Sequence, residues 1–404
     1  MSTSILERLT ELLGPAGVGR DPSGLPRAMP ADPEAAAAVL RLAHAEGWKV
    51  RVEGRGSWLS GDAPADFSLS SRGLDQLVSL SPADLVATVQ AGVPMDELQR
   101  RLAEAGMWLA LDPPGRPDRT IGSIIATASA GPLRAGYGSI RDQILGCIFV
   151  TGDGRVIQAG GRVVKNVAGY DLTKLQTGGF GGFGFLAEFH LRLRARPERD
   201  VTLVARGDRD RLTRVGRDVL EAAIEVAACE LCAPAVVAET TWCLGARLVG
   251  GAAAVEAESR ALATATEFEW TELSADRGHA FWAMAARAPL GGNITIRLGA
   301  LTDGLDETLD LVSEELDEGL ITAGAVAGGV RWSGSASIEQ LRLVRRVAAP
   351  REIPLTLERA PWEVRKAVGH FGAYREGVGP IVGRLRETFD PSGALVVALE
   401  GTDD

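Results

Sequence analysis

The chain has 404 residues, 46% hydrophobic and 24% charged, a composition typical of a globular protein of two or three domains. Its net charge of −10 argues against a general nucleic-acid binder, because a phosphate backbone needs a basic face. No stretch of about 20 apolar residues occurs, so direct membrane insertion is not expected. Four cysteines and no signal-peptide pattern favour a cytoplasmic location, with peripheral attachment at the inner membrane through a partner left open.

The first 60 residues predict a helix, a strand and a glycine-rich loop. A helix is predicted over residues 30–47, with Asp32 as its N-cap and Gly47 as its terminating residue. Residues 48–53 predict a short strand that leads into the loop 54–57, Gly-Arg-Gly-Ser. A glycine-rich turn after a strand exposes main-chain N–H groups that can hold a phosphate.

The region up to residue 197 continues with short strands and helices. Residues 185–194 alternate, with Ala187, Phe189 and Leu191 on one face and polar side chains on the other, which predicts a strand. The other predicted elements of this region are strands over 85–90, 144–151 and 155–158, and helical segments over 95–105 and 171–176.

After about residue 198 the character of the sequence changes. Glycine becomes rarer, and the chain predicts helices over 209–228 and 252–265 with strands over 246–249 and 293–298. Pro197 therefore marks a predicted domain boundary. The last residues predict a helix, a turn and an apolar strand. The expected domains are residues 1–197, residues 198–379, and a C-terminal segment 380–404 that returns to the first domain.

Residues 179–184 match the spacing GxGxxG of dinucleotide-binding loops. Such a loop must follow a strand and open a helix, so that the helix N-terminus meets the pyrophosphate. Here a helical turn precedes the motif and a strand follows it, so the order is reversed. The motif is interpreted either as a turn that feeds a core strand or, preferably, as close main-chain packing near a cofactor.

Four segments carry the functional signal. The first is Val-Glu-Gly-Arg-Gly-Ser-Trp at 52–58, and the second is Leu-Asp-Pro-Pro at 111–114 followed by Thr-Ile-Gly-Ser-Ile-Ile-Ala at 120–126. The third is Ser-Ala-Gly-Pro at 129–132 followed by Tyr-Gly-Ser-Ile-Arg-Asp-Gln-Ile-Leu-Gly at 137–146, and the fourth is Gly-Arg-Val-Val-Lys-Asn-Val-Ala-Gly-Tyr-Asp-Leu at 161–172. In this order they resemble the FAD-binding domain of the PCMH or vanillyl-alcohol-oxidase type. Among that type, the FAD-binding subunits of bacterial glycolate oxidases are most similar. The resemblance covers about residues 25–197.

The resemblance implies an α+β fold, with a PCMH-type FAD-binding domain of two α/β subdomains and a smaller α+β cap domain. It implies that the loop 53–59 holds the FAD pyrophosphate, that the Gly122 and Gly131 regions line the ribityl chain and flavin ring, and that the strand near Leu186 contacts the cofactor through its main chain. The implied FAD contacts are Glu53, Gly54, Arg55, Gly56, Ser57, Trp58, Pro113, Thr120, Gly122, Ser123, Gly131, Pro132, Tyr137, Gly138, Asp142, Lys165 and Leu186.

The sequence departs from this family in two turns and in its histidines. Relatives read GSxGTLG where residues 178–184 read Gly-Gly-Phe-Gly-Gly-Phe-Gly, so the hydroxyl donors are lost and two phenylalanines replace smaller or aliphatic groups. After Asp-Pro-Ser-Gly at 390–393, the Asn and Arg of the family's C-terminal motif are absent. No histidine lies in the loop 53–59, which implies non-covalent FAD.

The catalytic histidine strand of hydroxy-acid-oxidising relatives is also absent. The four histidines are separated in sequence, so a histidine metal site is not expected, and each is interpreted as a surface or packed residue. Arg297 and Arg331 lie among β-formers and are candidates for holding a substrate carboxylate, with a structural ion pair or a solvated strand edge as the alternative. Cys229 and Cys232 form a CxxC without further cysteines at iron–sulfur spacing, so inert thiols are favoured.

These observations support one leading hypothesis and two alternatives. The leading hypothesis is an FAD-binding subunit of a glycolate or 2-hydroxy-acid oxidising complex, working beside a catalytic flavin subunit and an iron–sulfur subunit. Its substrate is expected to be a short 2-hydroxy acid. The alternatives are a stand-alone FAD-linked alcohol oxidase and a non-catalytic subunit that has lost flavin.

Overall fold

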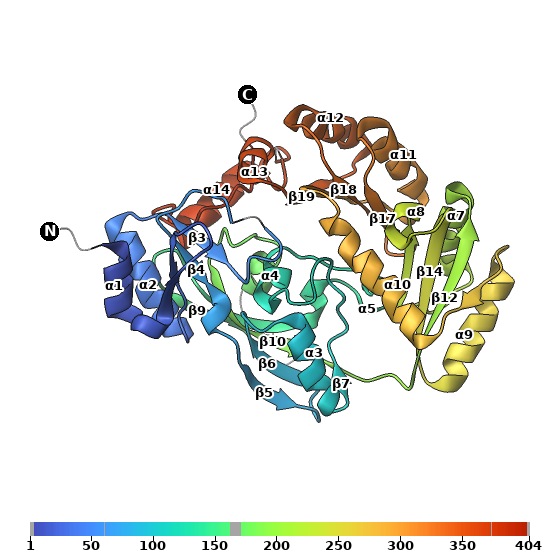
Figure 1. Cartoon of the computed structure of the whole chain (residues 1–404), viewed down its shortest axis with the longest axis horizontal. Helices are drawn as coiled ribbons and strands as arrows, with labels where there is room; N and C mark the ends of the chain where they lie inside the picture. The colour runs from blue at the N-terminus through green and yellow to red at the C-terminus, as the bar shows by residue number, and fades with distance from the viewer. Residues whose placement is uncertain (1–3, 60, 162–170, 373, 402–404) are drawn as a thin grey trace.

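The computed structural model describes residues 4–59, 61–161, 171–372 and 374–401, and Figure 1 shows them as two groups of sheets and helices joined near residue 197. The first group contains a mixed four-stranded sheet in the order β1-β2-β4-β3. Its strands are β1 (Val18–Arg20), β2 (Pro26–Ala28), β3 (Val50–Glu53) and β4 (Phe67–Ser70), and its helices are α1 (Ile5–Leu13) and α2 (Pro33–Glu46).

An antiparallel five-stranded sheet lies beside it, in the order β5-β6-β10-β8-β9. Its strands are β5 (Leu77–Ser81), β6 (Val86–Gln90), β8 (Ile144–Val150), β9 (Val156–Gly160) and β10 (Phe185–Arg192). The helices of this part are α3 (Met95–Glu104), α4 (Ile121–Ala126), α5 (Arg134–Tyr137) and α6 (Leu172–Gln176), and a small ribbon pairs β7 (Met107–Trp108) with β11 (Arg194–Ala195).

The second group is built on an antiparallel eight-stranded sheet in the order β15-β12-β14-β13-β17-β18-β16-β19. These strands are β12 (Arg199–Gly207), β13 (Ala228–Cys232), β14 (Trp242–Gly250), β15 (Thr271–Glu272), β16 (Ile294–Leu298), β17 (Leu320–Gly324), β18 (Val330–Gly334) and β19 (Leu355–Arg359). The helices are α7 (Arg209–Glu221), α8 (Pro234–Val237), α9 (Ala252–Ala265), α10 (Ala275–Arg287), α11 (Leu305–Glu315) and α12 (Ile338–Ala348).

The two faces of the eight-stranded sheet have different coverings. Apolar side chains of α7, α9, α11 and α12 pack with the strands in one core cluster, so these helices cover one face. Helices α8 and α10 pack on part of the other face, and α5 contacts β13 there. The remainder of that face is turned toward the first group of sheets (Figure 1). Residues of both groups line a cavity there.

The C-terminal residues connect the two groups. Helices α13 (Trp362–Val368) and α14 (Val378–Phe389) follow β19. The main chain then returns to β3, where Val50 donates to the Ala394 carbonyl at 2.8 Å and accepts from Val396 at 3.0 Å. The predicted apolar strand at the end of the chain is wrong, because Leu395 forms only an isolated bridge with Val50.

Most of the helices and strands that the sequence predicts are present in the structure. Asp32 caps α2 by accepting from Ala35 N at 2.7 Å, and Gly47 ends the helix in the left-handed conformation. The predicted helix over 209–228 is too long, because α7 ends at Glu221 and Ala228 already belongs to β13. The helix ends early because the chain must turn to place β13 inside the eight-stranded sheet. The residues of the helix itself do not reveal this requirement.

Strand β10 is buried on both faces, although its alternation predicts one polar face. His190 is only 5% exposed, and its Nδ1 lies 3.1 Å from the Thr88 hydroxyl of neighbouring β6. The strand lies between β6 and β8 and carries two register shifts, so both of its faces meet other parts of the protein. The chain enters this strand from α6 through the glycine-rich turn, so the GxGxxG spacing here does not belong to a Rossmann-type loop, which follows a strand and opens a helix.

Candidate functional site

A cleft lies between the two sheets of the first group and the C-terminal segment. It is lined by the loop after β3, the first turns of α4, the turn before β10, and residues 395–397. These parts are distant in sequence and meet only in the folded chain. The predicted FAD contacts that line the cleft are Glu53, Gly54, Arg55, Gly56, Ser57, Trp58, Gly122, Ser123 and Leu186.

The loop after β3 presents unpaired main-chain donors to the cleft. The N–H groups of residues 55–59 donate to no other described residue. Gly56 has φ +71°, which favours glycine, and a Cβ atom there would meet nothing within 4 Å. The Ser70 hydroxyl donates to the Gly54 carbonyl at 3.0 Å and holds the start of the loop. Successive free N–H groups in such a turn form a concave site for an anion.

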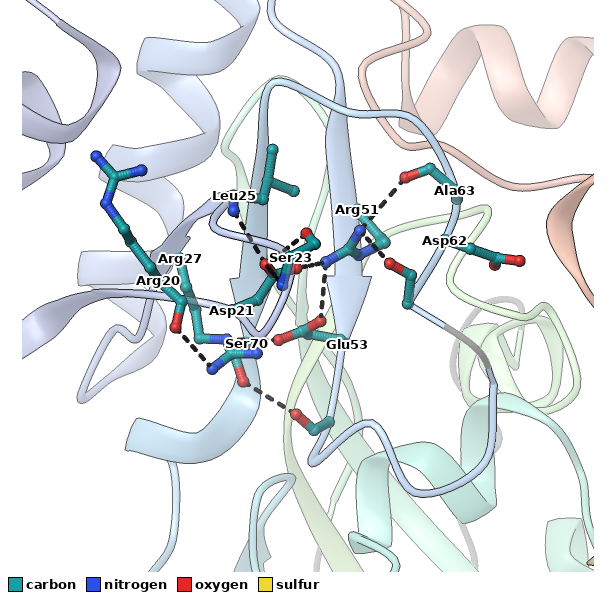
Figure 2. Close-up of polar contacts among 12 residues, drawn as sticks. Arg20, Asp21, Ser23, Leu25, Arg27, Arg51, Glu53, Asp62, Ala63 and Ser70 are labelled. Carbon is teal, nitrogen blue, oxygen red and sulfur yellow. Dashed lines mark hydrogen bonds and ion pairs between the residues drawn. The ribbon is translucent and has the colours of Figure 1, made fainter.

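A buried ion-pair network next to this loop holds it in place, as Figure 2 shows. Arg51 of β3 forms an ion pair with Asp21, lies 3.5 Å from Glu53 Oε2, and donates to the Gly61 carbonyl at 2.6 Å. Burial by itself raises the pKa of Asp21, but hydrogen bonds from Ser23 and from Arg51 lower it to about 2. Arg51 therefore ties the two ends of the loop to β3, and Glu53 acts in this network as well as at the cleft.

Glycine allows the loop and α4 to approach each other closely. A Cβ atom on Gly54 would lie 2.4 Å from Thr120 Oγ1, and one on Gly122 would lie 2.8 Å from the Ala91 Cβ. The Thr120 side chain accepts from Ser123 N at 3.3 Å and caps α4. Thr120, a predicted FAD contact, therefore lies behind the cleft wall and supports it.

A buried arginine that the sequence did not single out lies behind the same wall. Arg119 is fully buried, donates to the Pro114 carbonyl at 2.6 Å and to Thr127 Oγ1 at 3.0 Å, and stacks 4.1 Å from the centre of the Trp58 ring. Burial lowers the pKa of Arg119 to about 9, still a cation at neutral pH. The Trp58 Nε1 is buried without a hydrogen-bond partner among the described atoms. A positive charge behind the cleft favours an anionic ligand.

The altered glycine-rich turn closes the cleft on its C-terminal side. Phe180, with φ +50°, stacks on His370 at a centroid distance of 3.8 Å and an interplanar angle of 19°. The His370 Nδ1 lies 2.6 Å from the Leu357 carbonyl, and its main-chain N–H donates to Ala398 at 2.8 Å. Burial lowers the pKa of His370 to about 3, so it is a neutral packed histidine. The phenylalanine that replaces a smaller family residue thus anchors the C-terminal segment.

Several predicted FAD contacts are not brought to this cleft. Tyr137 packs edge-on against Trp108, with Arg194 over its ring at 4.7 Å. Asp142 accepts from Ser139 N and Oγ at 2.8 and 2.7 Å and closes a capping box, with Gly138 next to it. These contacts shape the turn before β8. Pro113 lies outside the cleft lining. Lys165, with the rest of residues 162–170, lies outside the described residues.

Comparison with known proteins identifies the first group of sheets. Residues 27–160 match the family described as FAD binding domain. This region is an FAD-binding domain. A solved structure of alkyldihydroxyacetonephosphate synthase superposes with a TM-score of 0.69, covering 91% of this chain and 75% of that chain at 15% identity. That likeness concerns the fold alone and confirms the predicted fold class.

Relatives of known name match the FAD-binding domain. Glycolate oxidase subunit GlcE of Escherichia coli (strain K12) is 38% identical over 128 residues, 31% of this chain and 37% of that protein. D-2-hydroxyglutarate dehydrogenase of Xanthomonas citri pv. viticola is 34% identical over 179 residues, 44% of this chain and 38% of that protein. Glycolate oxidase subunit GlcD of Bacillus subtilis is 36% identical over 132 residues, 33% of this chain and 28% of that protein. The predicted resemblance to glycolate oxidase subunits is confirmed, and the matched regions span less than half of each relative.

A second cavity, of about 610 Å³, lies between the FAD-binding domain and the eight-stranded sheet. The FAD-binding domain contributes Gly131 and Pro132, both predicted FAD contacts, together with Arg134. The sheet contributes Arg297 and Arg331, the two candidate carboxylate holders. The fold therefore brings Gly131 and Pro132 to the arginines instead of to the cleft.

Both candidate arginines are paired with a buried glutamate. Arg331 donates to Glu358 from Nε at 2.7 Å and from Nη2 at 3.1 Å, and also to the Ala130 carbonyl at 3.2 Å. Arg297 Nε donates to Glu358 at 2.8 Å. Burial by itself raises the pKa of Glu358, but Arg331 and Arg297 lower it to about 2. Both arginines thus form ion pairs with Glu358, and their role as carboxylate holders stays a prediction.

Two further carboxyl groups near this cavity titrate close to neutral pH. Burial raises the pKa of Glu230, on β13, to about 7. Burial likewise raises the pKa of Asp112 to about 7, although Leu133 N donates to this carboxyl group at 3.0 Å. Sequence reasoning missed both residues and Glu358, because each derives its environment from segments far away in the chain.

The cysteines carry no visible redox site. Cys147, Cys229, Cys232 and Cys243 are free and buried. Burial raises the pKa of the Cys147 and Cys229 thiols to about 12, which agrees with inert thiols. Within the described part of the chain, no group of three His, Cys, Asp or Glu side chains is placed to hold a metal ion. None of the described helices has the length and apolarity needed to cross a membrane.

Proposed function

We propose that this chain is the FAD-binding subunit of a complex that oxidises a short 2-hydroxy acid to a 2-oxo acid. In this proposal it holds FAD non-covalently and passes electrons to partner subunits, a catalytic flavin subunit and an iron–sulfur subunit. The names of the relatives support the reaction class, since they include glycolate oxidase subunits and a D-2-hydroxyglutarate dehydrogenase.

The observation that carries the proposal is the row of N–H groups at residues 55–59 that donate to none of the described residues, at the edge of a cleft lined by the FAD-binding domain. These donors fit a diphosphate, because buried main-chain N–H groups neutralise an anion without a side-chain charge. The partnerless Trp58 Nε1 and the buried cation of Arg119 also fit an anionic, polar ligand. FAD, when bound, accepts the hydride that leaves the substrate carbon.

Two features of the chain support the non-covalent mode and the need for a partner. The loop 53–59 contains no histidine that could tether the flavin. The four cysteines are buried and free, and they do not have iron–sulfur spacing. The described thiols therefore offer no route for electrons from a reduced flavin, which fits transfer to a partner subunit.

The stand-alone FAD-linked alcohol oxidase is favoured by one observation, the cavity that this chain itself builds beside Arg297. Turnover of a 2-hydroxy acid by the isolated yellow chain with a dye acceptor supports that alternative. Activity only after the partner subunits are added supports the complex. A chain that stays colourless after incubation with FAD supports the non-catalytic subunit that has lost flavin.

Substitution of Gly56 tests the FAD site with a matched pair. A side chain at this position enters open space, and both Asp and Asn tolerate its positive φ. Gly56→Asp places a negative charge beside the expected diphosphate, whereas Gly56→Asn has the same size without the charge. We expect Gly56→Asn to retain the absorbance of bound flavin at ~450 nm. Gly56→Asp should bind FAD at least ~10-fold more weakly than Gly56→Asn. Equal FAD affinity in the two variants contradicts the assignment of this loop.

The mode of attachment is tested on the same preparation. After precipitation of the protein with acid, non-covalent flavin remains in the supernatant, whereas covalent flavin stays with the pellet. Yellow pellets contradict the non-covalent proposal.

A further inference from the structure

The cavity between the FAD-binding domain and the eight-stranded sheet contains an excess of positive charge at its inner end. Thr322 of β17 lies directly opposite Arg331 of β18, and Arg331 lies directly opposite Arg297 of β16. Side chains of directly opposed residues share one face of a sheet. Glu230 of β13 lines the cavity beside this row, and Arg134 reaches it from the FAD-binding domain.

The arginines around the cavity differ in how many of their donors already form hydrogen bonds. Arg331 is buried and uses its donors on Glu358 and on the Ala130 carbonyl. Arg297 has 28% of its side chain exposed, and a single hydrogen bond, from Nε to Glu358, is present. The Arg134 side chain donates to no other described residue. The carboxylate of Glu358 thus pairs with Arg331 and Arg297, while Arg134 lies near both arginines, and Arg134 and Arg297 have donors left.

We infer that this cavity binds a small carboxylate anion through Arg134 and Arg297, with Glu230 at its inner end, and that Arg331 positions these groups instead of touching the ligand. Guanidinium donors match a carboxylate in a two-pronged arrangement. The inference deepens the proposed function and relies on it only for the choice of a 2-hydroxy acid as ligand.

The surroundings of Glu230 predict how binding depends on pH. The groups around it are Arg331 from β18, Thr322 from β17, which forms a side-chain hydrogen bond with it, Asp112 from the FAD-binding domain, and the Cys232 thiol on its own strand. Helix α5, which carries Arg134, contacts β13. Because burial raises the pKa of Glu230 to about 7, this side chain changes from neutral to anionic between pH 6 and pH 8. A charged Glu230 repels an anion, so binding is tighter at pH 6.

The acidic residues Asp303 and Glu307, which also line the cavity, do not neutralise Arg134 and Arg297, because each of them pairs with another arginine. Glu307 pairs with Arg351 at 2.8 Å, and Asp303 pairs with Arg217 at 3.2 Å. Partial burial and the charges of Arg297 and Arg331 lower the pKa of Arg134, which reports the crowding of cations there. An anion that enters the cavity relieves this repulsion.

The test measures binding of glycolate to the FAD-loaded full chain by isothermal titration calorimetry, with the neutral analogue glycolamide in parallel. We expect glycolate to bind and glycolamide to bind at least ~10-fold more weakly. Arg134→Gln, an exposed position, should weaken glycolate binding at least ~10-fold. The control Arg260→Gln removes a surface arginine on α9, away from the cavity, and should bind glycolate as the wild type does.

Glu230→Gln provides a second, independent measurement. The wild-type Kd for glycolate should rise several-fold, about 3- to 10-fold, from pH 6 to pH 8, and this rise should be clearly smaller in Glu230→Gln, in which only Asp112 still titrates in this range. Equal binding of glycolate and glycolamide, or unchanged binding in Arg134→Gln, overturns the inference. A yellow chain that binds no glycolate overturns it and leaves the FAD proposal standing. A colourless chain that binds glycolate with this pH dependence supports the inference and contradicts the proposed function.

Discussion

Glu358 neutralises two arginines in the interior of the eight-stranded sheet, and its replacement should be costly. The carboxylate has no exposed surface and accepts from Arg331 and Arg297 at 2.7 to 3.1 Å. Glu358→Gln keeps the size of the side chain and one acceptor but removes the charge. Two guanidinium groups then share a buried environment without a counter-ion, and removal of one partner of a buried pair destabilises by about 3–5 kcal/mol.

The pKa of Glu358 gives a magnitude that agrees with this range. It falls from 4.5 to about 2 on folding, and at ~1.4 kcal/mol per pKa unit the difference is worth about 3 kcal/mol. Because the pKa in the folded protein lies below its ordinary value, this stabilisation is complete above pH 4.5 and is lost as the pH falls toward 2. The variant should therefore differ most from the wild type at neutral pH.

Urea unfolding followed by tryptophan fluorescence measures this effect, since Trp332 is buried next to Arg331. We expect Glu358→Gln to lower the free energy of unfolding by about 3 kcal/mol at pH 7, and the difference from the wild type to narrow as the pH is lowered from 5 to 3. Glu267→Gln, which removes an exposed partner of Arg211, should leave the midpoint unchanged. An unfolding midpoint of Glu358→Gln equal to that of the wild type refutes the reasoning.

Three further predictions concern buried groups. Folding lowers the pKa of His370 from 6.5 to about 3, so the unfolded chain binds a proton here at a higher pH than the folded chain does, and stability falls as the pH drops below 6.5. In His370→Gln the Tm should therefore fall less between pH 7 and pH 4 than in the wild type. An equal dependence of Tm on pH in the two proteins contradicts this. Phe180→Leu removes the stack on His370 and should lower stability by about 1 kcal/mol in thermal melting, whereas an unchanged Tm shows that the stack contributes nothing. Ellman's reagent should label no thiol of the folded chain and four after unfolding, and rapid labelling before unfolding contradicts the burial of Cys147, Cys229, Cys232 and Cys243.

Local sequence signals predicted most elements of the FAD-binding domain. The cap at Asp32 and the left-handed end at Gly47 are properties of adjacent residues, so the helix over 30–47 was predictable within a few residues. The end of α7 and the irregular path after Asp390 were not, because they depend on which strand the chain must join next.

The candidate site was predictable only in part. The resemblance indicated the loop 53–58, Gly122, Ser123 and Leu186, and the fold brings all of these to one cleft. It did not indicate Arg119, which becomes notable only because the fold buries it fully behind Trp58. Nor did it indicate His370, which meets its partner Phe180 only in the folded chain, where both residues line the cleft.

The sequence by itself was enough to predict the FAD-binding domain, because four segments in a fixed order resemble the PCMH-type FAD-binding domain. Only the tertiary structure decided the roles of the arginines. The contact of Arg331 with Ala130 joins residues 201 positions apart, and its pairing with Glu358 crosses from one strand to another. The energy of a buried charge depends on which groups surround it, and those groups are assembled by the fold and not by the neighbouring sequence.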